Sequence, residues 1–209
     1  MRAKTITITP DAVDPNGIYT EAVVAAAGAI TLAGALVSGT VATMDYARRI
    51  GIISSGDDHL ITFTVVGTDA DNRAISEVIT GGATTTVESA AYFKTIASIT
   101  ASAAAAANVT IGTVDEFVSS TIPVDHYNHN PVTVSIETVT GTINFSIEET
   151  FSGIWDDGAN VFRTASTATL TTITAAAFMD MDNHITGIRL VGNSYSADAA
   201  VKMVINSDG

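Results

Sequence analysis

Two short segments combine histidine with acidic residues at spacings that a metal ion could use. His126 and His129 are separated by two residues in a polar stretch, and Asp180 and Asp182 stand four and two positions before a further histidine. Imidazole nitrogens suit zinc, whereas clustered carboxylate oxygens suit calcium. These four residues are therefore candidate metal ligands. Solvated loop residues and Asx-turns explain the same patterns and are the favoured interpretation, so no metal and no other cofactor is predicted.

A third segment, residues 11–17, is also rich in side-chain oxygen atoms. It lacks the acid spacing and the terminal bidentate glutamate of an EF-hand. Asp and Asn commonly close turns by accepting hydrogen bonds from backbone N–H groups two residues further on. We expect this segment to be a loop closed in that way.

Trp155, the only tryptophan, precedes the adjacent acids Asp156 and Asp157. An indole ring can stack on a sugar, so Trp155 is a candidate ligand-binding residue; the commoner use of a single tryptophan is to anchor a loop in a core. Glycoside hydrolysis would need two carboxylates about 5 to 9.5 Å apart. Glu148 and Glu149 are adjacent and would point to opposite faces of a strand, which makes them poor partners for each other.

Other catalytic motifs are missing from the sequence. It contains no Gly-x-Ser-x-Gly elbow, and Gly81-Gly82 lacks the spaced glycines and lysine of a phosphate-binding loop. The absence of cysteine excludes thiol nucleophiles, thiolate zinc sites and disulfides. No catalytic residue is predicted, and we expect a protein that is not an enzyme.

The charge balance argues against nucleic acid as a partner. Nine Lys and Arg face 22 Asp and Glu, giving a net charge of −13, which repels a phosphate backbone. The longest apolar stretch, residues 22–37, consists mostly of Ala, Gly and Val and is shorter than the roughly 20 residues that cross a bilayer. We predict no membrane segment, and the alternating residues 5–9 do not form the apolar run of a signal peptide.

The elements that must position these side chains are predicted to be strands. Threonine occurs 31 times, mostly beside Ile, Val and Phe in short runs, which is the residue usage of β-sheets. Strict alternation is clearest at residues 61–65, 132–137 and 143–148. Strand-like runs recur about every 8 to 12 residues between turn residues, a spacing typical of sandwiches and barrels. The predicted class is all-β, with at most one or two short helical turns.

Two connections are predicted to close local hairpins, because turn-forming residues lie between strand-like runs. They are residues 67–72, which are rich in Asp and Asn, and Thr140-Gly141-Thr142.

The four prolines suggest a domain boundary. Pro123 and Pro131 bracket a polar stretch, while the long strand-like blocks contain no proline. We predict two antiparallel β-sandwich domains in tandem, immunoglobulin-like or jelly-roll-like, at residues 1–122 and 131–209, joined by a linker at 123–130.

Six segments follow one another in an order that is more informative than any one of them. They are residues 30–39, 48–58, 61–69, 75–81, 92–100 and 109–112. This succession resembles virion structural proteins of tailed bacteriophages over residues 30–113, and residues 131–134 and 188–190 are similar in layout but less specific. The alanine run at 101–107 departs from the pattern, since a turn containing glycine is expected there.

The resemblance implies a non-enzymatic, β-rich subunit of a phage particle, assembled in the host cytoplasm. A head-to-tail or tail component is slightly favoured over a capsid decoration protein. The implied partners are major capsid, portal, connector or tail proteins and further copies of the chain. The alternative is a carbohydrate-binding or host-recognition module that uses Trp155 and the acidic loops. Residues 22–37 form a hypothetical docking segment, because Ala and Gly let another backbone approach closely; packing inside its own domain is the other interpretation.

Overall fold

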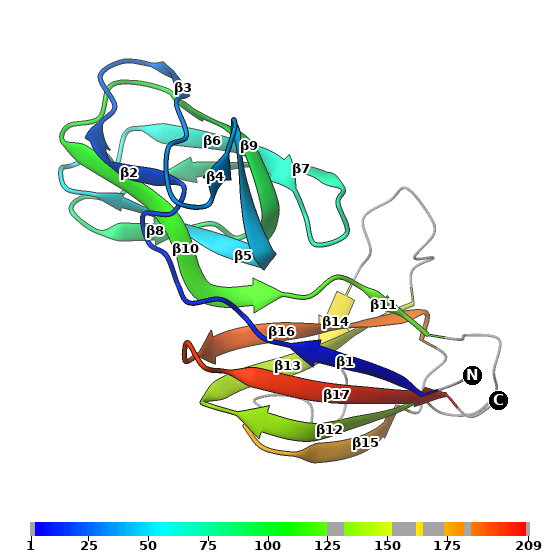
Figure 1. Cartoon of the computed structure of the whole chain (residues 1–209). Helices are drawn as coiled ribbons and strands as arrows, with labels where there is room; N and C mark the ends of the chain where they lie inside the picture. The colour runs from blue at the N-terminus through cyan, green and yellow to red at the C-terminus, as the bar shows by residue number, and fades with distance from the viewer. Residues whose placement is uncertain (1–2, 125–131, 152–161, 165–173, 182–184, 208–209) are drawn as a thin grey trace. The chain divides into compact units, whose positions relative to one another are not determined.

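The computed structural model describes residues 3–124, 132–151, 162–164, 174–181 and 185–207. Every regular element in these ranges is a β-strand, which confirms the predicted all-β class (Figure 1). The described ranges contain no helix that is long and apolar enough to span a lipid bilayer.

The chain forms two compact units. Unit 2 is Val13–Phe117, and unit 1 combines Met1–Ala12 with Val118–Gly209. These bounds differ from the predicted 1–122 and 131–209, because β1 (Lys4–Ile8) pairs along its length with β17 (Ala200–Ser207) in unit 1. Alternation identifies a strand but not its partner. Only Pro123 and Val124 of the predicted linker are described, and Pro123 belongs to β11 (Ile122–Pro123), which pairs with β16.

Unit 2 is built on five long strands that lie in the order β10-β5-β9-β6-β7. Short strands extend this arrangement: β2 pairs with β10, β3 with β9, and β4 and β8 with β5. The strands are β2 (Tyr19–Val23), β3 (Gly28–Ile30), β4 (Val37–Ser38), β5 (Val41–Ser54), β6 (Thr62–Thr68), β7 (Ala74–Thr80), β8 (Thr86–Glu88), β9 (Phe93–Ala101) and β10 (Asn108–Val118).

The core of unit 2 follows from the alternation that the sequence displays. Phe63 and Val65 of β6 are fully buried, as are Ile96 and Ile99 of β9. The intervening threonines and serines are more accessible. Each buried aliphatic or aromatic side chain contributes about 1.5 to 3 kcal/mol relative to exposure.

The predicted hairpin at residues 67–72 is confirmed, because β6 pairs with β7 over seven residue pairs. Asp69 Oδ1 accepts hydrogen bonds from the backbone N–H groups of Asp71 and Arg73, at 2.8 and 2.9 Å. Asn72 adopts a φ of 62°, a left-handed conformation that Asn tolerates better than most residues. The turn chemistry read from the sequence therefore fixes the register of this pair.

Unit 1 contains a four-stranded sheet in the order β1-β17-β12-β15 and a second group in the order β14-β13-β16, with β11 on β16. The strands not yet given are β12 (Val132–Thr140), β13 (Ile143–Thr150), β14 (Phe162–Thr164), β15 (Ala177–Met181) and β16 (Gly187–Tyr195). Val134 and Met203 are buried from the first sheet, and Phe145, Ile147 and Leu190 from the second group.

The predicted hairpin at Thr140-Gly141-Thr142 is wrong. β12 pairs with β15 and β17, whereas β13 pairs with β14 and β16. Gly141, with a φ of 65°, instead lets the chain pass from one sheet to the other. The Thr142 carbonyl accepts the N–H of Ser196 at 2.7 Å, and the Thr142 N–H donates to Ser196 Oγ at 2.9 Å. Two alternating runs joined by a glycine have the same sequence pattern whether they pair with each other or belong to different sheets.

Unit 2 also buries an ion pair. The Arg48 side chain is 2% exposed and makes a two-pronged contact with Asp45, Nε to Oδ1 at 2.7 Å and Nη2 to Oδ2 at 2.8 Å. Lys94 Nζ donates to the backbone oxygens of Met44 and Asp45 at 2.7 and 2.6 Å. Burial lowers the pKa of Lys94, an effect that the Asp45 carboxylate opposes and Arg48 reinforces.

Candidate functional site

Of the four predicted metal-ligand candidates, the structure describes only Asp180. It is exposed on β15, and its Oδ1 accepts a hydrogen bond from the Thr133 hydroxyl at 2.6 Å. Asp182, His126 and His129 lie outside the described residues, as does Trp155. Within the described ranges no three His, Asp or Glu side chains come together as a metal-binding group.

The remaining acidic candidates have identifiable neighbours. Asp14 Oδ1 accepts the backbone N–H of Asn16 at 3.3 Å, which is the Asx-turn expected for residues 11–17. Glu148 forms an ion pair with Arg189, at 2.6 Å from Nη2, while the neighbouring Glu149 is 1% exposed. The two glutamates therefore differ sharply in environment, as adjacent strand positions should.

The hypothetical docking segment contributes to both the core and the surface. Val24, Ile30 and Leu32 are buried in the hydrophobic core of unit 2. Val23 is 56% exposed, and the four alanines at 25, 26, 27 and 29 are exposed. Packing inside its own domain therefore holds for part of the segment, and docking through the exposed part stays a prediction.

A pocket of about 320 Å³ opens at this segment. It is lined by Tyr19 and residues 23–31, which include no charged side chain. Alanine and glycine dominate the lining, so backbone and Cβ atoms form most of its wall. We call this feature the alanine pocket.

Neighbouring loops hold the alanine pocket in place. The Val24 carbonyl accepts the N–H of Ala105 at 2.8 Å, and Ala106 donates to the buried Asp58 carboxylate at 2.7 Å. Gly28, with a φ of 135°, begins β3 in a conformation that L side chains rarely adopt. The alanine run at 101–107 thus supports the pocket in place of the glycine turn that the resemblance led us to expect.

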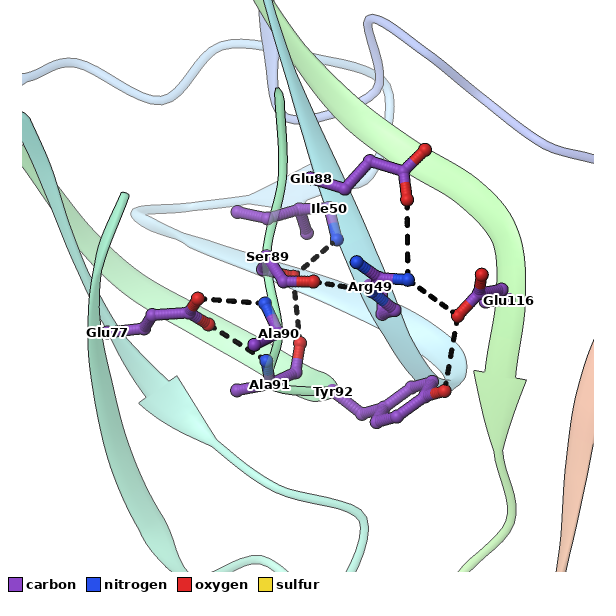
Figure 2. Close-up of polar contacts among 9 residues, drawn as sticks. All are labelled: Arg49, Ile50, Glu77, Glu88, Ser89, Ala90, Ala91, Tyr92 and Glu116. Carbon is purple, nitrogen blue, oxygen red and sulfur yellow. Dashed lines mark hydrogen bonds and ion pairs between the residues drawn. The ribbon is translucent and has the colours of Figure 1, made fainter. Parts of the chain in front are cut away.

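A second group of polar side chains surrounds Arg49 on β5 (Figure 2). Arg49 Nη1 lies 2.8 Å from Glu116 on β10 and 3.4 Å from Glu88 on β8, and its Nε donates to the Ser89 carbonyl. The Tyr92 hydroxyl donates to Glu116 at 3.3 Å. The hydrogen bond with Glu116 is the main cause that raises the pKa of Arg49.

The loop between β8 and β9 receives further hydrogen bonds (Figure 2). The buried Ser89 hydroxyl accepts the N–H of Ile50 and donates to the Ala91 carbonyl. Both oxygens of Glu77 accept backbone N–H groups, from Ala90 at 2.8 Å and Ala91 at 2.9 Å. These groups satisfy one another, so the arrangement tethers a loop to three strands and presents no activated nucleophile.

No pattern in the sequence indicates the Arg49 group. Arg49 and Glu116 are 67 positions apart, and they meet only because β5 and β10 are neighbours in the sheet. A charged residue within an alternating run is ordinarily interpreted as solvent-facing. Its partner becomes identifiable only when strand order is known.

The effect of His59 on Asp57 can be tested by measuring the pKa of the Asp57 carboxyl group. His59 Nδ1 lies 2.5 Å from Asp57 Oδ1, and this hydrogen bond is the main cause that lowers the pKa of Asp57 below 3.8. We expect His59→Ala to raise the Asp57 pKa toward its ordinary value, as measured by NMR titration of the carboxyl carbon. Since the folded-state pKa is depressed, the stabilisation is present above the unfolded-state pKa and is lost as pH falls through the folded one. An unchanged pKa in the variant would show that the ring does not stabilise the carboxylate.

No protein-family model, curated protein or solved structure matches this chain. The fold and the candidate sites define an all-β protein with large antiparallel sheets, consistent with β-sandwich architecture. One surface feature of the described residues is the uncharged alanine pocket.

Proposed function

We propose that the chain is a non-enzymatic structural subunit of a tailed-phage particle, present in multiple copies and attached through protein contacts. A head-to-tail or tail position is favoured slightly over capsid decoration. The proposal combines the resemblance of residues 30–113 with the surface of unit 2. The partners are other virion proteins and further copies of the chain.

The alanine pocket is the observation that carries the proposal. Its uncharged lining lets a partner dock without desolvating a charge, which would otherwise oppose binding. Small side chains such as Ala26 lose little rotamer entropy when they become covered. Many copies then convert individually weak contacts into lasting attachment. A net charge of −13 keeps the free subunits soluble before assembly.

Placing a charge in the pocket tests this function. We expect Ala26→Glu to reduce incorporation of the chain into particles at least tenfold, because the carboxylate would be buried at the contact. Mass spectrometry of purified particles measures the incorporated amount. Ala26 is exposed, so the isolated variant should retain its circular dichroism spectrum and melting temperature.

Ala97→Glu is the matched control. Ala97 is also exposed, on β9, and it neither lines the pocket nor belongs to the alanine run at 101–107 that supports it. Native incorporation of both variants, or equal loss in both, would refute the pocket as the attachment site.

A further inference from the structure

Strand β7 forms one end of the strand order of unit 2 (Figure 1). It pairs with β6 through all seven of its residues, and no described strand pairs with its other edge. Backbone N–H and C=O groups along such an edge can pair with a strand of another molecule. The length of seven residues gives room for several interchain hydrogen bonds.

The exposed side chains of β7 include none of the residues that usually prevent another strand from pairing with such an edge. They are Ala74, Ser76, Val78 and Thr80, and the strand contains no lysine and no proline. Monomeric proteins commonly protect edges with charges, prolines or bulges. The only charged residue of β7, Glu77, is half-buried and binds the N–H groups of the β8–β9 loop.

Other edge strands of the described chain differ from β7. β1, β2 and β15 each carry an exposed charge, at Lys4, Glu21 and Asp180 respectively. β3 and β4 lack charges but have only three and two residues. β7 therefore combines length with exposed side chains that carry no charge.

The neutrality extends over the outer face of the sheet beside β7. We define the neutral face as the outward positions of β6, β7 and β9. They are Thr62, Thr64, Val66, Thr68, Ala74, Ser76, Val78, Thr80, Thr95, Ser98 and Thr100. Val78, 60% exposed, lies diagonally across from Val66, 39% exposed.

We propose that β7 pairs antiparallel with β7 of a second copy of the chain, which joins the two sheets edge to edge. Two chains of net charge −13 repel each other, so self-association is least opposed where the touching strands carry no exposed charge, as along β7. Identical strands also satisfy the twofold symmetry that most homodimers adopt. This inference rests on the proposed function, because it names a second copy of the chain as one partner in the particle.

The twofold axis passes beside Val78. In that register Val78 faces its own copy, and Glu77 faces Ile79. An axis at Glu77 would instead place two carboxylates opposite each other, which is destabilising. Pairing at Val78 also covers one of the most exposed valines of the described chain.

With the axis at Val78, residues 76–80 of β7 pair between the two copies, and such a short contact covers much less than the roughly 800 Å² per partner of a standard stable interface. The isolated protein should therefore dimerise weakly, and the contact should become permanent only where many copies are held together.

Cross-linking tests the pairing, and the absence of native cysteine makes the test clean. Residues facing each other in antiparallel strands have Cα atoms about 4.5 to 5.5 Å apart, which suits a disulfide. We expect Val78→Cys to form covalent dimers under mild oxidation at least tenfold faster than Leu60→Cys. Leu60 is 82% exposed and lies outside any strand, so it reports random collision.

Sedimentation of the native chain and of Val78→Lys gives an independent measurement. The added cations should weaken self-association at least tenfold, whereas Leu60→Lys should leave it unchanged. Equal cross-linking rates, or a native chain that stays monomeric at millimolar concentration, would overturn the inference. Failure here leaves the incorporation of Ala26→Glu as a separate test of the proposed function, so the two can fail independently.

Discussion

Replacing Asp45 with asparagine should lower the free energy of unfolding by about 3 kcal/mol, the lower end of the usual cost of breaking a buried ion pair, because Arg48 is buried whereas the Asp45 side chain is 16% exposed. The Arg48 side chain is 2% exposed and cannot turn to water without leaving the interior. Asparagine keeps the size of the side chain but removes the charge that both guanidinium nitrogens contact. Urea unfolding followed by circular dichroism measures the difference from the native chain.

A double replacement separates the charge from the packing. Asp45→Leu with Arg48→Met removes both charges while keeping apolar volume, and buried pairs replaced in this way often recover the lost stability. We therefore expect the double variant to be more stable than Asp45→Asn. Asp180→Asn is the control, because Asp180 is exposed and such a change usually stays within about 0.5 kcal/mol. A loss below 1 kcal/mol for Asp45→Asn would contradict the argument.

The Asp45–Arg48 ion pair shows why one strand could not be predicted from the alternation of its residues. Strict alternation marks residues 61–65, 132–137 and 143–148, but not β5, the strand that contains Asp45 and Arg48. A charged residue in an alternating run is normally counted as solvent-facing. Here Arg48 is 1% exposed because a residue three positions earlier neutralises it. Periodicity cannot show such a compensation.

The positions of strands were easier to predict than the pairing between them. Alternation located β6, β12 and β13, and turn chemistry located the β6–β7 hairpin. Nothing local distinguishes that hairpin from the crossing at Gly141, because both join alternating runs through a turn residue. The partner strand of β1 lies about 200 positions away, since Lys4 pairs with Ile205. Long-range pairing depends on the whole fold, so it could not be read from these segments.

The candidate surfaces also differ in whether the sequence alone could indicate them. Composition drew attention to residues 22–37, and the alanine pocket forms within them because Ala and Gly leave the backbone accessible. The Arg49 group and the free edge of β7 depend on which strands are neighbours and which strand is last. A sequence shows where small uncharged residues occur, but it does not show which strand lies at the edge of a sheet.

Gly67→Ala should cost about 3 kcal/mol, the upper part of the usual range for overpacking. A Cβ atom at Gly67 would lie 1.9 Å from the Thr95 backbone oxygen and 2.9 Å from its carbonyl carbon. Side chains can rotate away from such a contact, but this oxygen belongs to β9, which pairs with β6 along the centre of the sheet. The register between the two strands shifts at Val66 and Gly67, where the backbones approach closely.

Gly51→Ala is the matched control, since Gly51 is also a buried strand glycine. Its added Cβ would meet only methyl groups, Thr86 Cγ2 and Val114 Cγ1, both at 3.2 Å. Those side chains can shift by a few tenths of an ångström, so we expect a change within about 1 kcal/mol, comparable to the intrinsic difference between Gly and Ala. Chemical denaturation of both variants measures the contrast. Equal stability of the two would mean that β6 and β9 can separate at Gly67 without cost, and would remove close backbone approach as the reason for glycine at that position.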